Sequence, residues 1–325
     1  MTDQKPIRLA LIGARGYVGQ ELLQCLIAHD GLELVLASSS SQAGQPLTSV
    51  VPDWSGDQVF ADLGPDQIGE VEADVWVLAV PNNQSQAWVA AIEPAHAEAI
   101  ILDLGADYRF DENWTYGLTE FNRDALKTTR RIANPGCYAT GAQFGLMPIR
   151  EALAAPPVIF GVSGFSGAGR TPSPRNDPER LADNLIPYAL GGHVHEREIS
   201  THLGRIVRFY PHVASFFRGI SLTIAMRLTE AHTNQSLREM FQAAYENEPL
   251  IEISAEIPEI RELDPNAGLR IGGFNIDARD AQRGALVVVL DNLLKGAATQ
   301  ALQNLNLALG FDELSGVLNR SETAS

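Results

Sequence analysis

The sequence has little of what marks secreted, membrane-bound or nucleic-acid-binding proteins. Its two cysteines, Cys25 and Cys137, exclude a disulfide-stabilised scaffold and favour a reducing compartment, the cytoplasm. Lysine and arginine number 24 against 40 acidic residues, a net charge of −16 that disfavours nucleic acid and membrane surfaces as partners. The longest apolar runs, 75–80 and 285–290, are too short to span a bilayer, and the polar start 1–6 indicates no signal peptide.

The rest of the composition is that of a folded globular protein with two domains. Hydrophobic residues make up 45% and charged residues 20% of 325 residues, roughly twice the common length of one domain. In the first part, short apolar runs alternate with helical patterns, which predicts an open parallel sheet of the Rossmann type, that is, an α/β fold. Its strands are predicted at 7–12, 32–37, 75–80 and 99–102, with a first helix over 20–28.

After Cys137 the pattern changes to strands with fewer helices between them, which predicts a mixed-sheet α+β domain. The strands are predicted at 158–162, 206–210, 221–226, 270–276 and 285–290, and the helices at about 140–153 and 293–309.

Three glycines, Gly13, Gly16 and Gly19, stand between the first predicted strand and the first helix. The first permits a tight turn, the second lets the backbone approach a pyrophosphate, and the third lets the helix pack closely on the sheet. A helix N-terminus adds free N–H groups and a partial positive charge. This pattern predicts a dinucleotide-binding loop, with a purely structural turn as the alternative. The cofactor-binding residues of the loop also include Arg15, Tyr17 and Val18.

The end of the second predicted strand indicates which dinucleotide binds. An NAD-specific fold usually has Asp or Glu there to bind the ribose 2′-hydroxyl, whereas this chain has four serines: Ser38, Ser39, Ser40 and Ser41. Serine hydroxyls donate to a 2′-phosphate, which an acid would repel, and Arg15 in the glycine loop could reach the same phosphate. The sequence therefore favours NADP(H), and a polar loop with no nucleotide role is the alternative.

Cys137 follows a Pro-Gly turn and stands at the head of a predicted helix, in Asn-Pro-Gly-Cys at 134–137. A helix N-terminus stabilises a thiolate, which makes the sulfur a nucleophile near neutral pH. The alternative is a small buried side chain, as predicted for Cys25 on the apolar face of the first helix.

His193 and His195, in Gly-Gly-His-Val-His at 191–195, are the candidate proton carriers. They share a face on a strand but point about 200° apart on a helix, so only one is expected to serve the sulfur. The preceding glycines favour His193 as the acid–base group, and charged neighbours favour a substrate-binding or structural role for His195. A zinc site is disfavoured because it needs about four ligands, so no metal is predicted.

Three arginines are candidates for holding an anion, because a guanidinium grips carboxylate or phosphate at two points. Arg170 ends a glycine-rich loop, 163–170, Arg109 follows a buried strand, and Arg218 lies in a Phe-rich loop. Ordinary surface charge is the alternative for each.

These motifs together cover nearly the whole chain. They are Gly-Ala-x-Gly-Tyr-Val-Gly at 13–19, Asp-Leu-x-Ala-Asp-Tyr-Arg at 103–109, Asn-Pro-Gly-Cys-Tyr-x-Thr at 134–140, Val-Ser-Gly-x-Ser-Gly-Ala-Gly-Arg at 162–170, His-x-His at 193–195, Pro-His…Arg-Gly at 211–219, and Asp-Asn-Leu-Leu-Lys-Gly-Ala-Ala at 291–298. In them the chain resembles the N-acetyl-γ-glutamyl-phosphate reductases, NADPH-dependent enzymes of arginine biosynthesis. It departs from that family at Thr119 and Arg197, where the family has proline, and at Asn82-Asn83, where it has His-Gly.

The resemblance implies a reaction and its residues. Cys137 would accept the acyl group as a thioester, and His193, as an imidazolium, would keep the sulfur ionised and protonate the developing oxyanion. The implied product is N-acetylglutamate 5-semialdehyde with phosphate. The implied substrate-binding residues are Arg109, Asn134, Ser163, Ser166, Arg170, His195, Glu198 and Arg218, and Pro81 and Asn292 join the cofactor-binding set.

The resemblance also implies the domain organisation. An NADP-binding Rossmann domain would comprise 1–136 and 291–325, with the C-terminal helix returning to it, and a catalytic and dimerisation domain would comprise 137–290. A homo-oligomer, dimer or tetramer, is implied with it.

Three other functions stay open. The first is a related reductase acting on an aminoadipyl or aspartyl phosphate, because the departures flank the expected pockets. The second is a cysteine hydrolase that uses Cys137 and His193, and the third is a non-catalytic NADP-sensing module.

Overall fold

The computed structural model describes residues 5–263 and 268–317. The chain divides into two compact units, Met1–Pro135 with Ala297–Ser325, and Gly136–Gly296. Residues 291–296, predicted with the first domain, pack in the second unit, because Asp291 and Asn292 bond to the loop at Arg218 and Gly219.

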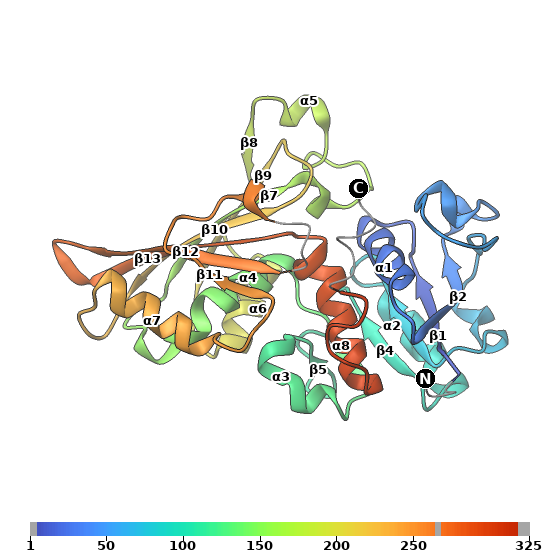
Figure 1. Cartoon of the computed structure of the whole chain (residues 1–325). Coiled ribbons are helices and arrows are strands. Elements are labelled where there is room, and N and C mark those ends of the chain that lie inside the picture. Colours follow the sequence, from blue (N-terminus) through green and yellow to red (C-terminus); the bar gives the residue numbers. More distant parts are fainter. Residues whose placement is uncertain (1–4, 264–267, 318–325) are drawn as a thin grey trace. The chain divides into compact units, whose positions relative to one another are not determined.

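The first unit contains a six-stranded sheet in the order β2-β1-β3-β4-β6-β5, with every pair parallel (Figure 1). Its strands are β1 (Ile7–Ile12), β2 (Leu32–Ser38), β3 (Val75–Leu78), β4 (Ile100–Asp103), β5 (Thr115–Tyr116) and β6 (Arg131–Ala133). Its helices are α1 (Tyr17–Ile27), α2 (Ser85–Ala95), α3 (Thr119–Leu126) and α8 (Thr299–Leu309).

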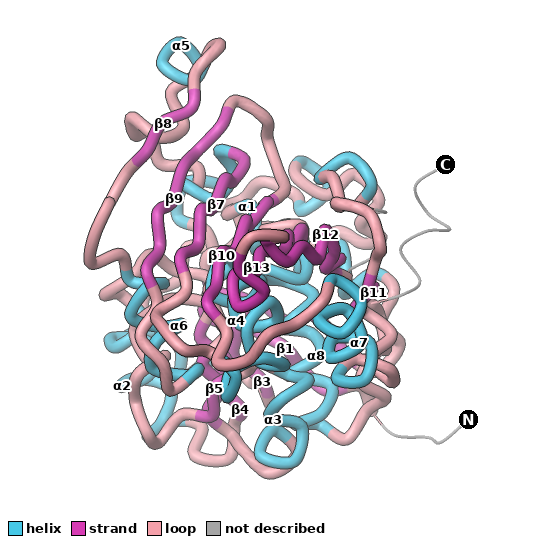
Figure 2. The backbone as a smooth tube through the Cα atoms, turned by 90° about the vertical axis from the view of Figure 1, so that its left-hand side faces the viewer, coloured by secondary structure: helices cyan, strands magenta, loops and turns pink. Residues whose placement is uncertain are grey.

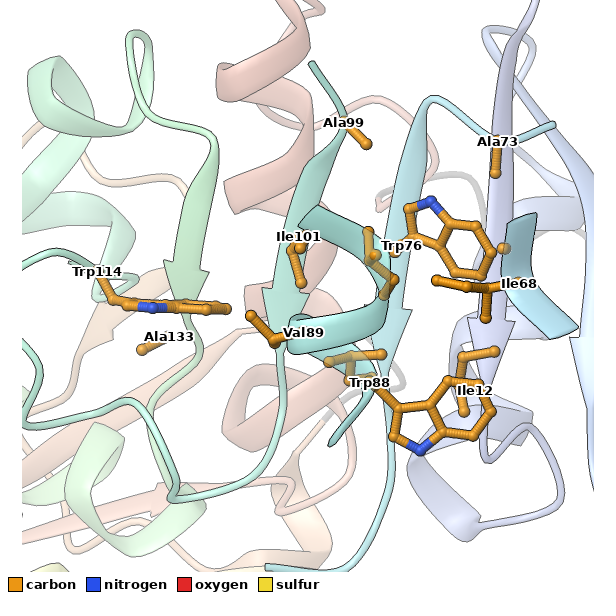
Figure 3. Packing of buried hydrophobic residues seen from close by; sticks show 13 residues of the cluster. Ile12, Ile68, Ala73, Trp76, Trp88, Val89, Ala99, Ile101, Trp114 and Ala133 are labelled. Atoms are coloured by element: carbon orange, nitrogen blue, oxygen red, sulfur yellow. The ribbon is translucent and has the colours of Figure 1, made fainter. Parts of the chain in front are cut away.

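Burial on both faces explains why the central strands β3 and β4 consist of apolar runs. Every residue of β3 and β4 is buried. On one face, Trp76 of β3 and Trp88 of α2 pack around Ile12 and Ile68, the latter from a 3₁₀ segment (Figure 3). This cluster fixes α2 against the sheet, so that the carboxyl ends of β1, β3 and β4 are held at one edge.

The second unit contains a seven-stranded mixed sheet in the order β11-β12-β13-β10-β7-β9-β8 (Figure 2). Its strands are β7 (Val158–Gly164), β8 (Leu185–Pro187), β9 (Arg208–Ala214), β10 (Ile220–Arg227), β11 (Ile251–Ile253), β12 (Leu269–Asp277) and β13 (Asp280–Leu290). Its helices are α4 (Cys137–Leu146), α5 (Pro178–Leu181), α6 (Val194–Leu203) and α7 (Asn234–Ala244). This mixed sheet and the parallel sheet of the first unit confirm the predicted fold class.

Two glycines seat α4 directly on the mixed sheet. A Cβ at Gly141 would lie 2.7 Å from a methyl of Leu290, and a Cβ at Gly145 would lie 2.5 Å from one of Ile224. The two positions are four apart and share one face of the helix. The close approach buries every residue of α4 after Cys137, which leaves the half-buried thiol at the start of a rigid helix.

The boundaries differ from prediction where local signals are weak. The helix predicted at about 140–153 begins at Cys137 and changes at Met147 into a 3₁₀ helix that ends at Ala152. The helix predicted at 293–309 begins with a π-helical turn, Leu294–Ala298.

Candidate active site

The glycine loop of the first unit has the geometry that a dinucleotide site needs. Gly13 has φ +81°, and a Cβ there would lie 2.3 Å from the Ala79 carbonyl oxygen, so only glycine fits. A Cβ at Gly19 would lie 2.7 Å from the Ala14 carbonyl oxygen, which shows how closely α1 packs on the turn. No side chain caps the N-terminus of α1 at Gly16. The two glycines therefore let the turn pack tightly against the backbone, and the uncapped N-terminus of α1 offers N–H groups to a pyrophosphate.

The other predicted cofactor residues of the first unit lie beside this loop or at the same edge of the sheet. Ser38 ends β2, and its carbonyl oxygen accepts N–H groups from Gly13 (3.1 Å) and Ala14 (2.9 Å). Four more follow the carboxyl ends of β1, β2 and β3: Arg15, Ser40, Ser41 and Pro81. The side chains of Ser38 and Ser39 are buried, whereas Ser40 and Ser41 are exposed. The two exposed serines are therefore the ones able to meet a ligand from solvent.

In the second unit, the N-terminus of α4 is fixed from two sides. The Gly136 N–H donates to Oε1 of Glu198 (2.8 Å), a fully buried carboxylate on α6. On the other side lies Gly296, where a Cβ would stand 2.8 Å from the Cβ of Cys137. The position of Cys137 is thus fixed by the hydrogen bond from its neighbour Gly136 to Glu198 and by close packing against Gly296.

His193 caps α6, with Nδ1 accepting the His195 N–H (3.1 Å). A neutral ring that accepts at Nδ1 carries its proton on Nε2. Burial, together with the charge of Arg175, lowers the pKa of His193 to about 4, although Glu196 opposes the shift. At neutral pH this lowered pKa favours the neutral ring of His193, with Nε2–H as a donor, over the imidazolium that the resemblance implies.

Aromatic rings connect the histidines to the start of α4. The His195 ring meets those of His193 (4.8 Å between centroids) and Tyr138 (5.9 Å). The Tyr138 hydroxyl donates to the His212 carbonyl oxygen (2.7 Å). Burial and then the charge of Cys137 raise the pKa of Tyr188, whose ring lies 5.6 Å from that of His193. The structure therefore brings both histidines into the surroundings of Cys137.

The glycine-rich loop 163–170 is held by the loop that carries Arg218. Asn292 accepts the Gly219 N–H with Oδ1 (2.7 Å) and donates from Nδ2 to Ser166 Oγ (2.9 Å). Ser163 Oγ donates to the Gly164 carbonyl oxygen (2.9 Å). The loop is thus a rigid segment whose buried polar side chains bond within the protein.

Arg218 itself forms an ion pair from Nε to Asp291, so its charge is compensated. Arg170, at the end of the glycine-rich loop, is exposed.

Arg109 and Asn134 form a similar buried network in the first unit. Arg109 is 6% exposed, and it donates to the carbonyl oxygens of Asn134 (2.9 Å) and Leu104 (3.0 Å). Asn134 Oδ1 accepts from Asn304 of α8 (3.0 Å), which also donates to the Gly117 carbonyl oxygen (2.8 Å). This network fixes the strand end three residues before Cys137.

Several residues predicted to contact ligands are also tied into the protein by hydrogen bonds. Glu198 and Asn134 are fully buried, and Arg109 and Asn292 nearly so, with hydrogen bonds to the protein itself. Their hydrogen bonds hold the segments that carry the other predicted site residues, and their contact with a ligand stays a prediction. Sequence reasoning missed Arg175, Tyr188 and Gly296, and only the last lies in a recognisable motif.

Within residues 5–263 and 268–317, no group of three or more His, Cys, Asp or Glu side chains is placed to hold a metal ion. Every helix in these ranges falls short of the length and apolar character of a membrane span.

Two family models match the sequence. The NAD-binding domain of semialdehyde dehydrogenase matches residues 8–129, and the dimerisation domain of semialdehyde dehydrogenase matches residues 137–292.

Curated relatives match over almost the full length. N-acetyl-gamma-glutamyl-phosphate reductase of Xanthomonas campestris pv. campestris (strain B100) is 48% identical over 98% of this chain and 100% of its own. The protein of the same name from Stenotrophomonas maltophilia (strain R551-3) is 48% identical over 95% of this chain and 97% of its own. The mitochondrial protein arg11 of Schizosaccharomyces pombe is 45% identical over 97% of this chain and 36% of its own.

Solved structures share the fold at low identity. Aspartate semialdehyde dehydrogenase II from Vibrio cholerae, complexed with ASA, has a TM-score of 0.76 at 18% identity and covers 94% of this chain and 99% of its own. Aspartate semialdehyde dehydrogenase with NADP from Candida albicans has a TM-score of 0.72 at 16% identity, with 93% and 98% covered.

Proposed function

This chain belongs to the N-acetyl-gamma-glutamyl-phosphate reductase family, and we propose that it catalyses the reaction this name describes. An N-acetylglutamyl 5-phosphate would be reduced to N-acetylglutamate 5-semialdehyde with release of phosphate, a step of arginine biosynthesis. The observation that carries the proposal is the half-buried thiol of Cys137 at the first residue of α4, in a chain 48% identical to reductases of that name.

Cys137 is the proposed nucleophile. The N-terminus of α4 favours negative charge on the sulfur, because free N–H groups and the helix dipole point toward it. The thiolate would attack the acyl carbon, phosphate would leave, and a thioester on Cys137 would remain. Backbone N–H groups at the start of the helix are suited to the oxyanion that forms in this step.

His193 is the proposed acid–base residue, in the neutral form that the structure indicates. Its Nε2–H can donate to the acyl oxygen as negative charge develops there. His193→Asn is therefore expected to lower turnover on the order of 10²–10⁴-fold, and His195→Asn to raise mainly KM. The opposite pattern in steady-state kinetics would assign the acid–base role to His195.

The cofactor is an NAD(P) dinucleotide, and we propose NADP(H). When bound, it supplies the hydride that takes the acyl group to the aldehyde. The tight backbone packing that Gly13 and Gly19 permit is typical of a pyrophosphate-binding turn, and the exposed residues Ser40 and Ser41 offer hydroxyls suited to a 2′-phosphate. A kcat/KM for NADH equal to that for NADPH would contradict this role of the serines.

We also propose that the protein works as a homo-oligomer. The matched dimerisation domain supports this, and so do the exposed side chains Val158 and Phe160 on the open face of β7. Large exposed apolar side chains that share a sheet face favour contact with a second copy. Light scattering of the wild type and of the Phe160→Glu variant tests this proposal. The wild type is expected to be an oligomer and the variant to shift to monomer.

The cytoplasm is the proposed compartment, supported by the two free cysteines, Cys25 and Cys137.

The assay for the function is the reverse reaction. Purified protein is given NADP⁺, phosphate and one of three semialdehydes: N-acetylglutamate, N-acetyl-aminoadipate or aspartate semialdehyde. Phosphate-dependent NADPH formation is expected to be fastest with N-acetylglutamate semialdehyde. A preference for another semialdehyde would point to a related reductase, and thioester cleavage without NADP would point to a hydrolase.

A further inference from the structure

Arg175 is a cation near the histidines that no motif indicated. It lies in the segment between β7 and β8, which extends beyond the rest of the mixed sheet (Figures 1 and 2). Asn176 fixes this segment, because its Nδ2 donates to the carbonyl oxygens of Gly169 and Thr171 (both 2.8 Å) and its Oδ1 accepts the Ser173 N–H (2.7 Å). The position of Arg175 is therefore set by a bonded turn.

The guanidinium of Arg175 lies over the ring of Tyr188, with 5.0 Å between Cζ and the ring centroid. That ring in turn meets His193, 5.6 Å away. A guanidinium over an aromatic face is held in place by the ring quadrupole while its N–H groups stay available at its edge. Arg175, Tyr188 and His193 thus form a row that ends at the histidine pair.

The charge of Arg175 is not compensated by an acid. It forms no ion pair with any residue in the part of the chain that the structure describes. Two arginines predicted to bind an anion are engaged, Arg109 with backbone carbonyl oxygens and Arg218 with Asp291. In a protein of net charge −16, an anionic substrate needs such a local cation.

We propose that Arg175 binds an anionic oxygen group of the substrate, its phosphate or its carboxylate, at the edge of the Tyr188 ring. This inference rests on the proposed function, which supplies a substrate carrying both groups. A planar fork of N–H donors suits either one. Arg175 is in this view a substrate-binding residue that acts from the same unit as Cys137.

The pKa of His193 provides a second measurement that tests the position of Arg175. The groups that face its ring are Tyr188, His195 and Phe209, with Arg175 and Glu196 as the charged neighbours. Because the charge of Arg175 helps to lower the pKa of His193, Arg175→Gln is expected to raise that pKa from about 4. A histidine NMR titration of the whole protein measures it, and an unchanged pKa would place Arg175 away from the histidine.

The test compares Arg175→Gln and Arg175→Lys with the wild type in the reverse reaction. Arg180→Gln is the matched control, because Arg180 is an exposed arginine on helix α5 of the same segment. For Arg175→Gln, KM for phosphate or KM for the semialdehyde is expected to rise on the order of tenfold to a hundredfold. Arg175→Lys should recover part of the loss, and Arg180→Gln should behave as wild type.

The two KM values, for phosphate and for the semialdehyde, distinguish which substrate group Arg175 binds. A rise confined to KM for phosphate assigns the phosphate, and a rise confined to KM for the semialdehyde assigns the carboxylate. Unchanged KM values for both, in a folded Arg175→Gln protein, would overturn the inference. A wild type inactive with N-acetylglutamate semialdehyde would instead refute the proposed function.

Discussion

The contact between Gly296 and Cys137 leads to a quantitative prediction for Gly296→Ala. The new methyl would stand 2.8 Å from the Cβ of Cys137 and 3.1 Å from the Asp291 carbonyl oxygen. Non-bonded carbon atoms prefer about 3.5–4.0 Å, so the two positions must separate by about 1 Å. Neither Cys137 nor residue 296 can shift easily. Helix α4 is buried along its length, and the Gly296 N–H is bonded to the Asp291 carbonyl oxygen (2.9 Å).

Two costs follow from this overlap. Overpacking of a dense interior destabilises by about 1–3 kcal/mol. A displacement of about 1 Å at the nucleophile lowers turnover on the order of 10²-fold, since attack depends on the position of the sulfur. We therefore expect Gly296→Ala to fold with a lower melting temperature and to lose most of kcat.

The assay measures kcat for NADP-dependent semialdehyde oxidation together with the melting temperature. Gly69→Ala is the control, because a Cβ there meets nothing within 4 Å, and it is expected to match the wild type. Gly296→Ala with kcat within threefold of the wild type would refute the reasoning about this contact.

Two further predictions concern α6. Glu198→Gln keeps an acceptor oxygen for the Gly136 N–H but removes a buried carboxylate beside the start of α4. The pH profile of Cys137 alkylation by iodoacetamide should therefore move to lower pH, and an unmoved profile would refute an effect of the Glu198 charge on the thiol. His193 has a folded-state pKa of about 4 against a usual 6.5, so the protein should lose stability as pH falls from 6.5 to 4, by roughly 3 kcal/mol. His193→Asn keeps a capping acceptor without this titration, and urea unfolding at pH 5 and pH 7 should show a smaller difference than in the wild type; an equal difference would refute the assignment.

The fold was predictable where the chain carries local signals. Continuous apolar runs indicated β1, β3 and β4, because strands of a covered parallel sheet are buried on both faces. Gly13 indicated the turn after β1, since a positive φ and a close carbonyl both require glycine.

The site was predictable only in part. Helix α6 lacks a regular apolar pattern around His193, so strand and helix could not be separated from the sequence. A carboxylate is usually exposed, and nothing local indicated that Glu198 is buried against Gly136. Arg175 reaches Tyr188 only through the fold, because the contact joins two loops whose spacing carries no pattern.

The central claim is that a thioester forms on Cys137, and trapping that thioester tests it most directly. The protein is incubated with N-acetylglutamate semialdehyde and NADP⁺ without phosphate, quenched in acid and analysed by peptide mass spectrometry. The account predicts an N-acetylglutamyl adduct on Cys137 with a matching burst of NADPH, in the wild type and in Cys25→Ser. No adduct or burst is expected in Cys137→Ser. An adduct on another residue, or more than a tenth of wild-type turnover in Cys137→Ser, would contradict the account.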